Sequence, residues 1–159
     1  MSSEKQNVGL AGEYAVASYL CRKGLYAQLT LGNHKKTDLL VEDTESGHLF
    51  CVSVKAKKGP QWPKVKGITR KTDVIVFVDF KNKQANDMPD FYVLNLQAWK
   101  KLILKLKKQR QRGSIIDRRT NTLHWPSDKG KSNGYYGSYI SPKDIEPYKD
   151  AWKKVFKLK

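Results

Sequence analysis

Several residue types that define common protein classes are scarce in this 159-residue chain. There are only two cysteines, Cys21 and Cys51, and their wide separation argues against a disulfide framework or a zinc site. The three histidines are not spaced as metal ligands. No apolar run approaches membrane-spanning length, and the N-terminus lacks a signal-peptide core. We therefore expect a cytoplasmic protein with buried, reduced thiols and no membrane partner.

Acidic side chains are also scarce relative to basic ones. The chain holds 15 Asp and Glu against 31 Lys and Arg, which gives a formal net charge of +16, and the excess is greater in the second half. Such a field attracts polyanions, so we expect a nucleic acid as partner, with DNA favoured over RNA. An anionic membrane surface or a set of merely solvated lysines would be the alternative explanations of the charge.

Hydrophobic periodicity predicts an α/β protein with a mixed central sheet flanked by helices. Helices are expected at 8–23 and 96–113, and strands at 25–31, 38–42, 48–56, 73–80 and 90–95. The basic stretch 57–72 is interrupted by proline and glycine and is expected to be a loop. Ser141 and Pro142 are expected to open a last helix. We predict a single domain over 1–159, with a core at about 8–112 and a basic, loop-rich extension at about 113–159.

A carboxylate and an ammonium group lie near the ends of two successive predicted strands. Asp38 opens one strand, and Lys55 lies near the end of the next. If the strands pair as a hairpin, Asp38 lies close to Ser53 and Lys55, which share one face by the two-residue period. A carboxylate can hold a divalent cation, and an ammonium group can stabilise the charge that builds on an attacked phosphate. The pattern therefore suits hydrolysis of a phosphodiester.

Four segments follow one another along the chain: the predicted helix GEYAVASYLCRKG, the strand segments TDLLV and VSVK, and the predicted buried strand DVIVFVDF. Over roughly residues 8–95 this order resembles the PD-(D/E)XK nuclease superfamily, whose core is shared with restriction endonucleases and Holliday junction resolvases. The resemblance implies a restriction-endonuclease-like fold and an endonuclease that cleaves DNA with Mg²⁺ or Mn²⁺. It also implies that Asp38 binds the metal and that Lys55 stabilises the nucleophile or the transition state. Glu13 would support the metal site from the helix, and the Val54 backbone carbonyl would be a further ligand.

Two positions depart from the superfamily's pattern. Thr37 stands where the motif has Pro, and Ser53 stands where it has Glu or Gln. A hydroxyl group is a poor ligand for Mg²⁺, so Glu13 would have to enter the coordination shell or Ser53 would have to bind through a water. The alternative is a catalytically inactive module of the same fold that binds DNA, RNA or a protein. Many members of such folds act as dimers, so a homodimer is a further option.

A basic stretch without acidic residues follows the predicted site. It contains Lys57, Lys58, Lys64, Lys66, Arg70 and Lys71, with Trp62 among them. We interpret this stretch as a surface that follows the nucleic-acid backbone away from the site, with Trp62 stacking on a base or sugar. The alternative for this stretch is an exposed basic loop with Trp62 in the core. For the site, the alternatives are that Lys55 is a solvated lysine at a strand end and that Glu13 is an ordinary surface residue of the helix. Further along the chain, Arg118, Arg119 and the tyrosines at 135, 136 and 139 could extend the same surface.

Overall fold

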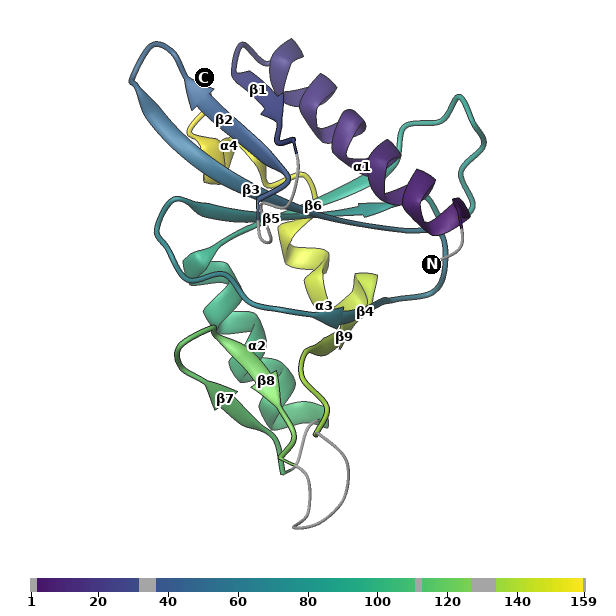
Figure 1. The fold of residues 1–159 in the computed structure, drawn as a ribbon, viewed down its shortest axis with the longest axis vertical. Coiled ribbons are helices and arrows are strands. Elements are labelled where there is room, and N and C mark those ends of the chain that lie inside the picture. The colour runs from purple at the N-terminus through teal and green to yellow at the C-terminus, as the bar shows by residue number, and fades with distance from the viewer. Residues whose placement is uncertain (1–2, 32–36, 111–112, 127–133, 159) are drawn as a thin grey trace.

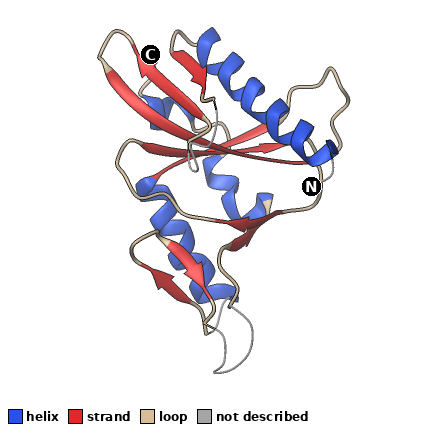
Figure 2. Ribbon diagram, viewed as in Figure 1, coloured by secondary structure: helices blue, strands red, loops and turns tan. Residues whose placement is uncertain are grey.

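The fold is built on a five-stranded mixed sheet (Figures 1 and 2). The computed structural model describes residues 3–31, 37–110, 113–126 and 134–158. The strand order is β1-β2-β3-β5-β6, with β1 at Tyr26–Leu29, β2 at Leu39–Asp43, β3 at His48–Lys57, β5 at Asp73–Asp79 and β6 at Asp90–Asn95. The central pair β3 and β5 is parallel, and the other neighbouring pairs are antiparallel. The predicted α/β class with a mixed central sheet flanked by helices is confirmed.

One face of the sheet is covered by the long helix α1 (Ser3–Arg22) and the short helix α4 (Trp152–Phe156). Alternate residues of β3, such as Val52 and Val54, pack there with Val16 and Leu20 of α1. The helix comes very close to the strand at Gly12, where an added Cβ would lie 2.6 Å from the Ala56 Cβ. Glycine is therefore required for this approach, which brings the middle of α1 next to the C-terminal half of β3.

The other face is covered by α2 (Leu96–Arg110) and by segments before and after it in the sequence, which contribute Trp62, Leu123 and Ile140 to the core. One apolar face of α2 is buried, with Trp99 and Leu106 inaccessible to solvent. Around it lie the two-stranded sheets β4–β9 and β7–β8, the helix α3 and the 3₁₀ helix η1. Their bounds are β4 Trp62–Val65, β7 Ile115–Asp117, β8 Thr122–His124, β9 Ser138–Ile140, α3 Pro142–Ile145 and η1 Glu146–Tyr148. α3 begins at Pro142, as predicted.

Three expectations are corrected by the structure. The stretch 57–72 is not entirely a loop, because β4 pairs there with β9. The core does not end near residue 112, since Trp152 and Phe156 pack in the cluster under α1. Cys21 is exposed and Cys51 only partly buried, so the thiols are not the buried pair that we expected. No helix in the described ranges is both long and apolar enough to cross a membrane.

Candidate active site and nucleic-acid interface

Asp38 lies immediately before β2 and contacts the neighbouring strand β3. Its Oδ2 accepts a hydrogen bond from the Val54 backbone N–H at 2.6 Å and a long one from the Ser53 hydroxyl at 3.5 Å. The two strands pair antiparallel with Leu39 opposite Val52, which is the hairpin predicted from the sequence. The Val54 bond fixes the Asp38 carboxylate beside β3, one residue before β2 begins.

Glu13 and Lys55 belong to the same charged group as Asp38. Burial raises the pKa of the Glu13 carboxyl, the nearby Asp38 carboxylate raises this pKa further, and the Lys55 ammonium group lowers it in part. The three side chains come from a helix, a strand start and a strand end, and the charges of Asp38 and Lys55 both act on Glu13. The close contact of α1 with β3 at Gly12 accounts for this, since Glu13 is the next residue.

The backbone of β3 adds an oxygen to this group. The N–H and C=O of one strand residue point to the same side, so the Val54 carbonyl points toward the side on which Asp38 lies. Mg²⁺ is commonly held by one or two carboxylates with retained waters, so Asp38, Glu13 and the Val54 carbonyl are the candidate oxygen ligands here. Within the described part of the chain, no group of three His, Cys, Asp or Glu side chains could hold a metal ion. A cation here would therefore depend on two carboxylates, the backbone and water.

Ser53 and Lys55 face a cleft of about 760 Å³ on the side of β3 opposite to Val52 and Val54. One wall comes from β4 and the segment after it and holds three cations, Lys64, Lys66 and Arg70. The lining residues are Cys51, Ser53, Lys55, Lys64, Lys66, Gly67, Ile68, Thr69, Arg70 and Asp73. A cleft with this size and charge suits a phosphate-bearing ligand.

Asp73 was not predicted to belong to the site, although it organises the basic wall. Its carboxylate accepts the backbone N–H groups of Thr69 and Arg70 at 3.1 and 2.8 Å, and the Arg70 Nε at 2.9 Å. Asp73 therefore fixes the turn and holds the Arg70 side chain, which is 60% exposed. Its place at the start of a buried strand concealed this role, but the Arg-x-x-Asp spacing across a turn was an available signal.

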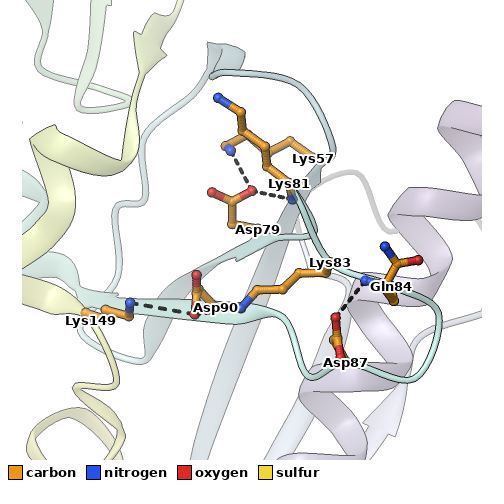
Figure 3. Close-up of polar contacts among 8 residues, drawn as sticks. All are labelled: Lys57, Asp79, Lys81, Lys83, Gln84, Asp87, Asp90 and Lys149. Carbon is orange, nitrogen blue, oxygen red and sulfur yellow. Dashed lines mark hydrogen bonds and ion pairs between the residues drawn. The ribbon is translucent and has the colours of Figure 1, made fainter.

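Lys57 and Trp62 are structural residues, so the predicted contacts of both with nucleic acid are wrong. The Lys57 Nζ lies 2.6 Å from the Asp79 Oδ1, and the two side chains are only 4% and 9% exposed (Figure 3). Trp62 is 2% exposed, packs edge-on against Phe77 and lies under the Lys57 ammonium at 4.5 Å. Strand alternation places Lys57 on the same face as Lys55, but β4 covers that end of β3 and turns Trp62 inward.

Two further lysines of the basic stretch are exposed outside the cleft. Lys58 lies near the N-terminal end of α1, where its Nζ is 3.9 Å from the Glu4 carboxylate. Lys71 is exposed but is not a lining residue. The structure therefore brings Lys64, Lys66 and Arg70 together with Lys55, and a role for Lys58 and Lys71 stays a prediction.

No family model and no curated protein matches this chain. Among solved structures, the bacterial homing endonuclease I-Ssp6803I is similar, with a TM-score of 0.45 and 16% sequence identity. The similarity covers 94% of this chain and 90% of that chain.

Proposed function

We propose that the protein is a divalent-metal-dependent DNA endonuclease of PD-(D/E)XK type with a restriction-endonuclease-like fold. The observation that carries the proposal is that Asp38 and Lys55 both act on the Glu13 carboxyl, and that Lys55 lines a cleft with a basic wall. Carboxylates that can bind a cation and an ammonium group next to a polyanion-binding surface are the parts that phosphodiester hydrolysis needs.

Each residue has a role in this proposal. Asp38, Glu13 and the Val54 carbonyl would hold Mg²⁺ or Mn²⁺, which when bound would neutralise phosphate charge and lower the pKa of a coordinated water. Asp38 is held ready by the Val54 N–H. Glu13 has a raised pKa partly because the Asp38 carboxylate repels its charge, and a cation between them would relieve this repulsion. The Lys55 ammonium group would stabilise the charge on the attacked phosphate.

The basic wall of the cleft would bind the DNA backbone. Lys64, Lys66 and Arg70 line the same cleft as Lys55, so a strand lying in it would place phosphates among these cations. Contacts of this kind release counterions, so affinity should fall steeply as salt concentration rises. Binding that did not change up to high salt would contradict this electrostatic assignment.

A second candidate function is favoured by Ser53. Its hydroxyl contributes a weak hydrogen bond to Asp38 at 3.5 Å where a carboxylate would add a metal ligand. In this alternative the protein retains the fold and the basic cleft and binds nucleic acid without cleaving it. Salt-sensitive DNA binding without cleavage or metal uptake would select this candidate.

The test is a Mg²⁺ and Mn²⁺ titration of the full chain with linear duplex, branched and single-stranded DNA, following both metal binding and cleavage. Lys55→Ala should lose cleavage and keep most of its DNA affinity, because the wall cations remain. Lys153→Ala is a matched control, since it removes the same charge from an exposed residue of α4 outside the cleft. Cleavage that survives Lys55→Ala, or is lost equally in Lys153→Ala, would show that the site is assigned wrongly.

A further inference from the structure

The hairpin β7–β8 has no part in the proposed chemistry, yet it contacts the basic wall of the cleft. Figure 1 shows it beside α2, at the end of the molecule remote from α1. The Gly67 backbone N–H, in the wall, donates to the Thr122 Oγ1 of β8 at 2.8 Å. An added Cβ at Gly67 would lie 2.2 Å from the Asn121 carbonyl oxygen, so only glycine permits this approach.

Two further hydrogen bonds fix the hairpin to the body of the protein. The Asn121 Nδ2 donates to the Ile68 carbonyl at 2.9 Å, and the indole N–H of the buried Trp99 donates to the Asn121 carbonyl at 2.8 Å. Leu123 of β8 is fully buried in the core under α2. The hairpin and the cleft wall are therefore held in a constant relative position.

The turn at the tip of the hairpin is also well ordered by its own contacts. The Thr120 N–H donates to the Asp117 carbonyl at 3.2 Å, and Asn121 adopts the left-handed conformation with φ 50° that follows such a turn. The Asp117 carboxylate accepts the Arg119 N–H at 2.9 Å and the Tyr136 hydroxyl at 2.8 Å. The exposed residues of this turn are two consecutive arginines, Arg118 and Arg119.

We propose that the β7–β8 hairpin enters the major groove of double-stranded DNA and that Arg118 and Arg119 contact guanine there. The inference rests on the proposed function and extends it, because it assigns sequence selection to an element separate from the chemistry. The B-form major groove is wide enough for a two-stranded ribbon, and arginine bonds the O6 and N7 of guanine with two N–H groups. The major groove of duplex RNA is too deep and narrow for side chains to contact the bases, so the inference favours DNA.

The experiment is selection of binders from a randomised DNA duplex library by the full chain without divalent metal. The protein should enrich a guanine-containing sequence, and the variant R118A/R119A should lose that enrichment. Each arginine that contacts a guanine should contribute about 5- to 150-fold to the ratio of affinities for the selected and a scrambled duplex. The matched control is K153A/K154A, which removes the same charge from exposed residues of α4 and should enrich the wild-type sequence. Both arginines are exposed, so thermal unfolding of R118A/R119A should match the wild type.

Four results would overturn the inference. An equal loss of affinity for selected and scrambled duplexes, with a shallower salt dependence, would mean that the arginines contact phosphates only. Unchanged enrichment by R118A/R119A would mean that the hairpin does not contact bases. Binding of DNA by the wild type without sequence preference would mean the same. Equal competition by duplex RNA would contradict insertion into the major groove. Absence of any DNA binding by the wild type would instead sink the proposed function, so the two failures are distinguishable.

Discussion

Replacing Asp38 by asparagine separates the charge of this side chain from its hydrogen bond. The Asp38 Oδ2 accepts the N–H of Val54, a residue only 8% exposed. Asp38→Ala leaves that N–H without its partner, which should lower the free energy of unfolding by about 1–3 kcal/mol. Asp38→Asn keeps a neutral acceptor in the same place, so it should lower the free energy of unfolding by about 1 kcal/mol, the difference between a charged and a neutral hydrogen bond.

Cleavage should respond differently from stability. Both variants remove the charge that would hold the metal, whose contribution of several kcal/mol to the transition state corresponds to about a 100-fold loss of rate or more. Urea unfolding measures the stability of each variant, and initial rates on labelled duplex DNA measure cleavage. Glu42→Gln, in the strand β2 that follows Asp38, is the matched control and should change neither quantity strongly.

A third measurement isolates the interaction between the two carboxylates. The Asp38 charge contributes to the raised pKa of Glu13, so in Asp38→Asn an NMR titration should find the Glu13 pKa lower than in the wild type. Cleavage by Asp38→Asn at the wild-type rate would refute the metal site. Equal stability of the asparagine and alanine variants would refute the role of the Val54 bond, and an unchanged Glu13 pKa would refute the coupling.

Four other substitutions test separate features of the molecule. Because the raised pKa makes folded Glu13 hold its proton more tightly than the unfolded chain does, its contribution to stability falls as pH rises above the ordinary carboxyl pKa. Glu13→Gln should remove this fall from the free energy of unfolding measured by urea at several pH values, and an unchanged profile would be evidence against the shift. Ser53→Glu should increase Mn²⁺ affinity in calorimetry, whereas equal affinity would mean that this position does not face the ion. Lys57→Ala leaves the buried Asp79 unpaired and should lower the free energy of unfolding by about 3–5 kcal/mol. Lys66→Ala should leave stability unchanged and reduce the salt slope of DNA binding by about 1, and the reverse pattern would contradict both assignments.

The part of the site that could be predicted from sequence is the part built from local contacts. The turn between β2 and β3 closes with a hydrogen bond from Gly47 to Asp43, and Gly47 has the positive φ of 73° that favours glycine. Once two short strands are joined in this way, the two-residue period determines which side chains share a face. The approach of Asp38 to Ser53 followed from those two facts alone.

The wrong predictions involve contacts between distant parts of the chain. The sequence of β4 does not indicate a strand, because it is short and contains Pro63. The backbone is irregular there as well, since Lys64 has a positive φ. It forms because Trp62 lies opposite Ile140 in β9, far along the chain. The same distance conceals the role of Trp152, which packs beside Tyr19 of α1 at a ring separation of 4.5 Å. Basic composition indicated a nucleic-acid surface over residues 57–71 but could not show that Lys57 and Trp62 are buried.

The replacement of a motif carboxylate by Ser53 has a consequence for how metal and DNA would bind. The free site has two carboxylates, Asp38 and Glu13, and the Lys55 ammonium group acts on Glu13. Its negative charge is therefore small, and metal affinity should be weak without substrate. DNA phosphates would add negative charge and oxygen ligands at the same place, so metal and DNA should each increase the affinity of the other by an equal factor. Lys55→Ala, which should not cleave, allows this factor to be measured from DNA affinity with and without Mg²⁺ and from Mg²⁺ affinity with and without DNA. Independent binding of the two ligands would show that they do not share the site.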